Sequence, residues 1–342
     1  MFLISPHVKQ FKANLHSHSV CSDGCLTPLE LKTAYRSRGY QILAITDHEC
    51  PMDHTAMSEP DFLMLTGYEA HIRPNSTANY DPYQSEIHMN LFARDPHNTT
   101  LLCYDPRYCK FMPPEQMALL PKVGSQRPRE YTTEYINEFI QTAKENGYIV
   151  SYNHPVWSME SQARILSYEG FFSMEIVNYG SYIINNMEYN GPLYDQLLLS
   201  GKQLFVHAGD DNHNCVPLDD PKSDSFGTAT MILADALTYD AVFSAMENGQ
   251  MYATMGPTFR EISFDGENIH VECSEAAVIH CHFGSKRPVQ VRAKHGESLT
   301  SADLPLDKTC RYMRVSIMDP QGRHADTRAF SREELGLPSF TN

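Results

Sequence analysis

The amino-acid sequence contains no apolar run that approaches the roughly 18 residues a transmembrane helix needs. It also lacks a recognisable secretory leader. The opening apolar run covers only residues 1–4, and the first lysines, Lys9 and Lys12, come after this run instead of before it. We therefore expect a cytoplasmic protein with no membrane partner.

Positive charge is scarce. The 342 residues include 27 lysines and arginines against 42 aspartates and glutamates, which gives a net charge of −15. Proteins that bind nucleic-acid polymers or anionic membranes are usually basic, so this balance argues against both. Bound divalent cations would offset part of the charge locally, and an acidic protein can therefore still accept a small anionic substrate.

Several motifs of covalent and nucleotide chemistry are missing. The nine cysteines are an odd number and include no Cys-x-x-Cys pair, so we expect free, reduced thiols. No Gly-x-Ser-x-Gly, P-loop or Gly-x-Gly-x-x-Gly string occurs. The sequence thus gives no support to a serine hydrolase or to a dinucleotide-binding fold.

Strand and helix patterns alternate through the first three quarters of the chain. A strand is predicted over 11–15, and a helix begins at Thr27-Pro28-Leu29-Glu30, where Thr27 is the N-cap and Glu30 closes a capping box. The alternation predicts an α/β fold with parallel strands and helices outside them. Further strands are expected over 41–46, 148–153, 171–177 and 203–206, and further helices over 132–146, 193–200 and 239–248.

The sequence pattern changes after Gly256-Pro257, where short runs of alternating apolar and polar residues and an Asp265-Gly266 turn appear. We expect two domains, an α/β domain over residues 1–258 and a small β-sandwich-like domain over 259–342. The second domain contains His280 and His282 in an His-x-His pattern without obvious carboxylate partners. We interpret this pair as one face of a strand and not as a second metal site.

Metal-capable side chains follow the predicted strands of the first domain in a regular order. Singly, each has an ordinary structural explanation, such as a turn, a helix cap or a surface histidine. Jointly they indicate a shared centre, because the carboxyl ends of strands in α/β folds meet on one face. A nearly closed barrel would bring the first and last members together. The set is His16, His18, Asp23, His48, Glu69, His88, His154, Asp211 and His213.

The types of these side chains narrow the choice of cofactor. Mixed imidazole and carboxylate ligands suit Zn, Mn or Fe better than Ca or Mg, and no thiolate is needed. Nine ligands exceed what one tetrahedral ion requires, so two or three divalent transition metal ions are expected. His207 and His71 are candidate general acids, and the alternative for each is an ordinary buried histidine with a satisfied hydrogen bond.

Two long polar segments, 71–85 and 94–130, interrupt the alternation. Loops of this length in a compact domain are usually functional or disordered. The second is either a solvated loop with ion pairs or a lid that contacts a phosphate or carboxylate. Its basic residues are Arg94, Arg107, Lys110, Lys122, Arg127 and Arg129.

The ordered strings resemble the PHP (polymerase and histidinol phosphatase) superfamily over about residues 11–258. They are Asn14-Leu15-His16-Ser17-His18 with Ser22-Asp23-Gly24, Ile45-Thr46-Asp47-His48, Gly67-Tyr68-Glu69, Asn153-His154-Pro155 and Gly209-Asp210-Asp211-Asn212-His213. The resemblance implies a distorted (β/α)7 TIM-like barrel with a trinuclear metal centre. The trailing β domain resembles the branch that includes aryl-carbamate hydrolases.

The resemblance also implies ligand roles. His16 and His18 would hold one metal with Glu69 and Asp211, and Glu69 would bridge to a second metal held by His88 and His154. Asp23, His48 and His213 would hold the third. The family usually has a small residue where this chain has Asp210, so the Asp-x-His alignment can be read one residue early; Asp211 is preferred because it alone gives that spacing.

These features predict a metal-dependent phosphoesterase that acts on a small phosphorylated metabolite or nucleotide through a metal-bridging hydroxide. Hydrolysis of a carbamate, amide or non-phosphate ester at the same centre is the alternative enzyme reading, and a non-catalytic PHP-like scaffold is the third. The expected partner is a small anionic molecule and not a nucleic-acid polymer. The sequence leaves the oligomeric state open.

Overall fold

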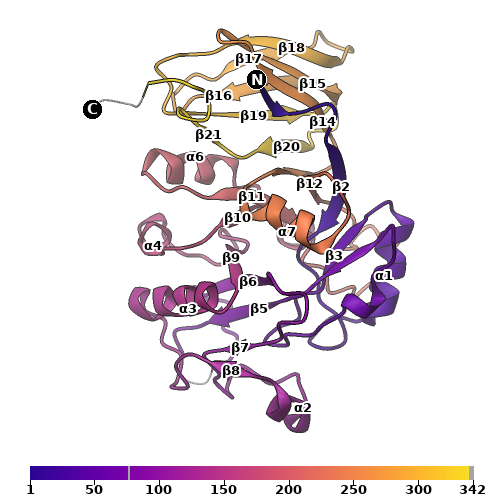
Figure 1. Cartoon of the computed structure of the whole chain (residues 1–342), viewed down its shortest axis with the longest axis vertical. Coiled ribbons are helices and arrows are strands. Elements are labelled where there is room, and N and C mark those ends of the chain that lie inside the picture. Colours follow the sequence, from indigo (N-terminus) through magenta and orange to yellow (C-terminus); the bar gives the residue numbers. More distant parts are fainter. Residues whose placement is uncertain (76–77, 339–342) are drawn as a thin grey trace.

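A computed structural model describes residues 1–75 and 78–338 (Figure 1). Its fold is mixed α/β, and one five-stranded sheet runs through the first part of the chain. In this sheet β9, β10 and β11 are parallel, whereas β6 runs antiparallel to both of its neighbours. The sheet order is β11 (Phe205–Gly209), β10 (Ser173–Asn178), β9 (Tyr148–Tyr152), β6 (Ile87–Ala93) and β5 (Gly67–Ile72).

A second, ten-stranded sheet contains the first strands of the α/β part and continues into the C-terminal part. Strands β2, β3 and β4 are parallel, and β12 then pairs antiparallel with β2. Nine of its strands follow the order β17 (Val289–Arg292), β16 (Val278–His282), β19 (Tyr312–Met318), β20 (His324–Thr327), β13 (Met251–Thr254), β12 (Ala229–Ala234), β2 (Lys9–Asn14), β3 (Ile42–Ala44) and β4 (Leu63–Leu65). The tenth, β21 (Phe330–Ser331), pairs with β19 beside this path.

The two sheets meet at two seams. At the first, β4 and β5 are separated by Thr66 alone, and an isolated parallel bridge joins His48 to Glu69. At the second, an isolated parallel bridge joins Ser17 to Asn212. The expected seven-stranded barrel is therefore observed only in part, because β2, β3 and the five-stranded sheet do not form one closed hydrogen-bonded sheet. The expectation of parallel strands fails at β6 and at β12, each of which runs antiparallel to both of its neighbours.

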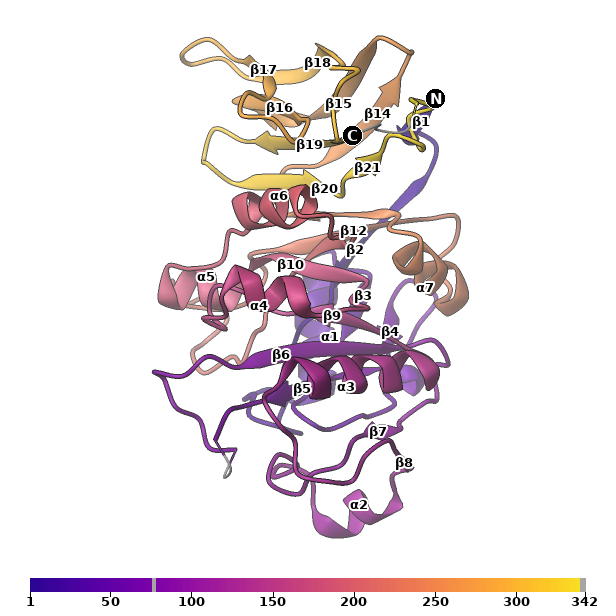
Figure 2. The ribbon, with the colours of Figure 1, turned by 90° about the vertical axis from the view of Figure 1, so that its left-hand side faces the viewer.

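Helices cover the outer side of the five-stranded sheet, where Figure 2 shows α3 and α4 in front of its strands. Helix α1 (Pro28–Ser37) begins with the predicted capping box of Thr27 and Glu30. Helix α3 (Thr133–Glu145) is capped by Thr132 and buries one apolar face. The other helices are α2 (Pro114–Leu119), α4 (Gln162–Ser167), α5 (Tyr179–Asn185), α6 (Gly191–Leu199), α7 (Tyr239–Glu247) and the 3-10 turn η1 (Thr55–Met57).

The C-terminal part is a β layer with its own apolar core, placed at one end of the molecule (Figure 1). A four-stranded sheet packs here, and its edge strand comes from the start of the chain because β1 pairs with β14. Its order is β1 (Phe2–Ile4), β14 (Phe259–Phe264), β15 (Asn268–Ala276) and β18 (Leu299–Pro305). The division of the chain at residue 258 stays a prediction.

A buried ion cluster ties this β layer to the α/β part. Arg314 of β19 donates to Asp195 of α6 at 2.6 Å and to Asp326 of β20 at 2.9 Å. Three short strands complete the described elements: β7 (Leu101–Leu102), β8 (Lys122–Val123) and β21 (Phe330–Ser331). None of the helices in the described part of the chain combines the length and apolar character needed to span a bilayer.

Candidate metal centre

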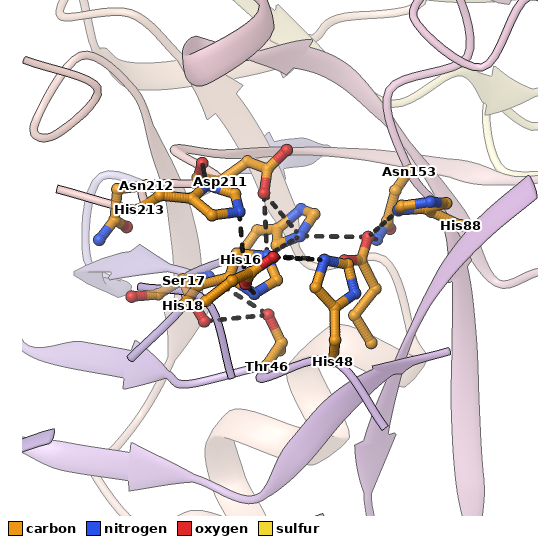
Figure 3. Close-up of polar contacts among 12 residues, drawn as sticks. His16, Ser17, His18, Thr46, His48, His88, Asn153, Asp211, Asn212 and His213 are labelled. Carbon is orange, nitrogen blue, oxygen red and sulfur yellow. Dashed lines mark hydrogen bonds and ion pairs between the residues drawn. The ribbon is translucent and has the colours of Figure 1, made fainter. Parts of the chain in front are cut away.

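His16 and His18 lie at the seam between the two sheets. The chain stays extended beyond β2, where the Asp211 amide donates to the His16 carbonyl at 2.9 Å and the His18 amide donates to the Asn212 carbonyl at 3.0 Å. Alternate residues of an extended segment point to the same side. The two imidazoles accordingly approach each other, with 3.3 Å between their Nε2 atoms (Figure 3).

Glu69 of β5 lies at the centre of the cluster and is buried. Its carboxylate oxygens lie close to ring nitrogens of five histidines that come from four separate parts of the chain. A single carboxylate among so many imidazoles has the position of a bridging ligand. The distances are 3.0 Å to His48, 3.2 Å to His88, 3.3 Å to His16, 3.4 Å to His154 and 3.5 Å to His18.

Asp211, and not Asp210, faces the cluster. Oδ1 of Asp211 is 3.1 Å from Nε2 of His16 and 3.0 Å from Nε2 of His18. The backbone of Asp211 has a left-handed φ of 52°, which turns this side chain toward the histidines. The Asp210 carboxylate turns away and accepts hydrogen bonds from Tyr35 and Thr228. The geometry thus favours the alignment that keeps Asp211 as the ligand.

Asp23, His48 and His213 form a more open group beside His18. The Asp23 oxygens lie 3.6 Å from ring nitrogens of all three histidines. This separation is too long for a hydrogen bond. It is close to the roughly 3.3–3.6 Å expected between two ligands that share one tetrahedral ion at about 2.0–2.2 Å. Asp23 is 37% exposed, so this side of the centre is open to solvent.

The donor set fits divalent transition metals by several measures. Three groups of side chains have ligand atoms within 4.8 Å of one another, and His18, His48 and Glu69 are each shared between two groups. Within the described residues, buried Nδ1 of His48, Oε2 of Glu69 and Nε2 of His88 have no hydrogen-bond partner. A buried polar atom without a partner costs free energy, and a bound cation would supply the missing one.

The charges of these groups are strongly coupled. Burial would lower the pKa of His88, but Glu69 and Glu86 raise it to about 10. Burial would raise the pKa of Glu69, but His88 and His16 hold it well below its usual range. Without metal ions, the carboxylates therefore favour a protonated ring at His88, whereas burial lowers the pKa of His48 to about 3 and favours its neutral ring. A metal ion would replace such protons, since imidazole ligates in its neutral form.

A buried layer of polar residues orients the donors. Oε1 of Glu175 is 2.8 Å from Nδ1 of His16, and its Oε2 accepts from the His154 amide at 2.8 Å and from Asn178 at 2.9 Å. Asn178 also donates to Asp211 at 3.1 Å. Such outer carboxylates fix the orientation and basicity of a ligating imidazole. We did not expect a site role for Glu175, although a charged residue inside the apolar strand 171–177 was a usable signal.

Several of the donor side chains line a pocket with a volume of about 450 Å³. Arg107 and Lys110 line it, so two of the six basic residues of the 94–130 segment reach the site, and Arg73 was not expected there. The other four lie elsewhere: Arg94 pairs with Glu247, Arg127 with Glu130 and Glu138, Arg129 with buried Glu49, and Lys122 donates to backbone carbonyls.

The two candidate acids differ in position. His71 lines the pocket, and burial together with His88 holds its pKa well below the ordinary value, which favours the neutral ring. His207 is fully buried, does not line the pocket and has its Nδ1 3.0 Å from the Ser173 hydroxyl. Burial lowers the pKa of His207 to about 4. The structure therefore gives His207 no contact with the pocket, and both catalytic roles stay predictions.

The second His-x-His pair lies in the β layer, as expected. The rings of His280 and His282 on β16 are 5.7 Å apart, and Nε2 of His282 is 2.9 Å from the Ser316 hydroxyl. Neither residue joins a possible metal-ligand group within residues 1–75 and 78–338.

Comparison with known proteins gives partial matches. No family model matches the chain. A segment is 32% identical over 90 residues to the DNA polymerase/3'-5' exonuclease PolX of Bacillus subtilis, and it covers 21% of this chain and 16% of that protein's length. The chain therefore spans about one sixth of this curated relative.

Two solved structures are similar along most of their length. A two-domain protein from Bacteroides vulgatus that contains a predicted PHP-like metal-dependent phosphoesterase is 12% identical, with a TM-score of 0.42 over 96% of this chain and 98% of that one. An amidohydrolase from Chromobacterium violaceum is 17% identical, with a TM-score of 0.37 over 59% of this chain and 87% of that one. The first of these structures thus contains a part described as PHP-like, the superfamily that the motifs of this chain resemble.

Proposed function

We propose that this protein is a metal-dependent phosphoesterase that hydrolyses a small phosphorylated molecule. The observation that carries the proposal is the convergence, in one pocket, of the Glu69-centred donor cluster with the cationic side chains of Arg73, Arg107 and Lys110. Donors of this type suit two or three Zn, Mn or Fe ions. The cations on the wall match the negative charge of a phosphate ester.

By the ligand roles that the resemblance implies, the donors would divide into three sets. His16, His18, Glu69 and Asp211 would hold one ion, Glu69 with His88 and His154 a second, and Asp23, His48 and His213 a third. Bound there, such ions supply an activated hydroxide near neutral pH and offset charge on the phosphoryl oxygens.

The surrounding residues contribute position and charge. Glu175 and Asn178 hold the ring of His16 and the carboxylate of Asp211 in place. Lys110 and Arg107 present positive charge to the phosphoryl group of a bound substrate, and the Arg107 guanidinium is itself oriented by Asp105. The neutral ring of His71 is available as a hydrogen-bond partner for the leaving group.

The test combines metal analysis with a substrate panel. The purified protein should contain two or three transition metal ions per chain by elemental analysis and should hydrolyse phosphomonoesters. Asp211→Asn should abolish turnover, whereas Asp219→Asn, a change outside the pocket, should not. Turnover of aryl carbamates, amides or carboxylic esters without phosphatase activity would favour the alternative reaction. Full metal content without hydrolysis of any of these classes would favour a scaffold.

A further inference from the structure

Trp157 forms part of the pocket wall next to the donor cluster. Its ring meets those of His154 and His88 edge to face, at centroid distances of 4.8 Å and 5.2 Å. The turn that carries it is fixed at both ends, since the Ser158 amide donates to the His154 carbonyl at 3.0 Å and the Trp157 amide donates to the buried carboxylate of Glu188. Trp157 is therefore held in place by the same turn that positions His154.

Two other large aromatic side chains that line this pocket, Tyr80 and Phe111, are exposed to solvent. Tyr80 is 58% exposed and its ring lies nearly parallel to that of Trp157, at an angle of 18° and a centroid distance of 6.3 Å. Phe111 is 42% exposed and lies nearly parallel to the His48 ring, 6.2 Å away. Exposed apolar groups gathered on one concavity mark a binding surface. The metal ligands and basic side chains assigned to the proposed reaction do not need these exposed aromatic side chains for support.

We propose that Trp157 and Tyr80 form a subsite for a flat, unsaturated ring in the part of the substrate that leaves the phosphoryl group. This inference rests on the proposed phosphoesterase function. A pocket of about 450 Å³ has room for an organic group beyond the phosphate, within the range of small-molecule sites. Aromatic side chains bind planar rings through their faces with little dependence on substituents, whereas a saturated ring of the same size lacks this interaction.

Two basic side chains, Arg73 and Lys110, complete the subsite. The Arg73 guanidinium lies 5.6 Å from the centroid of the Tyr80 ring and donates to the Glu86 carboxylate, so Tyr80 rests against a group that is itself held in place. Lys110 donates to the side-chain oxygen of Asn79, next to Tyr80, at 3.2 Å. The subsite thus combines flat apolar faces with positive charge, which suits a ring attached to an anion.

The single tryptophan of the chain supplies a direct binding signal, because all tryptophan emission comes from this pocket. Metal-loaded protein is titrated with phenylphosphonate and with cyclohexylphosphonate, which carry the same charge and differ in the flatness of the ring. We expect phenylphosphonate to change the emission of Trp157 and to bind on the order of tenfold more tightly. Calorimetry then measures both ligands with Trp157→Leu, which should lose most of this preference.

Matched variants separate the subsite from general damage. Tyr80→Leu changes a largely exposed side chain and should reduce the preference even if Trp157→Leu does not fold. Tyr83→Leu removes a 91% exposed tyrosine of the same segment that does not line the pocket, and it should leave the preference unchanged. Equal affinity of the wild type for the two phosphonates would overturn the inference.

The inference and the proposed function fail differently. Hydrolysis of aromatic and aliphatic phosphomonoesters with the same kcat/KM would overturn the ring subsite and leave the phosphoesterase in place. A clear preference for phenylphosphonate without turnover of any phosphomonoester would overturn the phosphoesterase and support a ring subsite for another reaction.

Discussion

Replacement of Glu175 by glutamine tests whether the buried polar layer controls metal binding. The Glu175 carboxylate has three hydrogen-bond partners at 2.8–2.9 Å: the His16 ring, the His154 amide and the Asn178 side chain. Glutamine keeps the shape but removes the charge, and its amide nitrogen must face one of these donors. The His16 ring then loses both its orientation and part of its basicity.

The expected loss is a 10- to 100-fold weaker affinity for the metal held by His16, or about 1.4–2.7 kcal/mol. Competition with a chromophoric chelator measures the affinity, and elemental analysis measures how many ions remain per chain. Glu160→Gln is the matched control. Its carboxylate is also buried, accepts hydrogen bonds from Tyr131 and Tyr152, and lies outside the pocket.

Glu160→Gln should lower the free energy of unfolding without changing metal affinity, whereas Glu175→Gln should change both. A Glu175→Gln protein that keeps its full metal content and binds within threefold of the wild type would refute the role assigned to this carboxylate.

Three further predictions concern buried charge. Because the carboxylates raise the pKa of His88 to about 10 in the metal-free protein, metal binding should release protons and affinity should rise with pH, as calorimetry in buffers of different ionisation enthalpy would show. Arg129→Met should lower the free energy of unfolding in urea by about 3–5 kcal/mol, because it leaves the buried Glu49 carboxylate without its ion-pair partner. Adding Glu49→Met should recover most of that loss. Burial raises the pKa of Glu188 from 4.5 to about 7, so the folded state binds this proton more tightly than the unfolded state. Stability should accordingly fall by up to about 3 kcal/mol as pH rises from 4.5 to 7, and Glu188→Gln should remove that slope.

The donor positions were predictable because a local rule covers most of them. His16, His48 and His154 each lie two to four residues beyond the end of a strand, and the ends of such strands meet. His88 breaks the rule, since it is the second residue of β6. It still reaches the cluster because β6 runs antiparallel to β5 and β9, which brings its start to the edge where β9 ends. The spacing of the motif carries no information about this reversal.

The pocket wall was less predictable, because it depends on contacts between segments far apart in the sequence. The 94–130 segment contains six basic residues of similar appearance. Which of them reach the pocket is decided by anchors such as the Arg129–Glu49 pair, which joins residues 80 positions apart. Arg73 and Trp157 lie outside any motif, and neither residue type alone indicates a binding role.

The incomplete barrel follows from the same seams that build the centre. Donors come from both sheets, with His16 and His18 beyond β2 on one side and Glu69 of β5 on the other. The carboxyl-end backbone is held across the seams by only a few hydrogen bonds, such as the one from the Glu49 amide to the Glu69 carbonyl at 2.8 Å. A continuous ladder would leave the strands roughly 4.8 Å apart with every backbone group paired. The open seams instead allow side chains from both sheets to point into the same pocket. The seams that interrupt the regular barrel therefore also bring the imidazoles close to the Glu69 carboxylate.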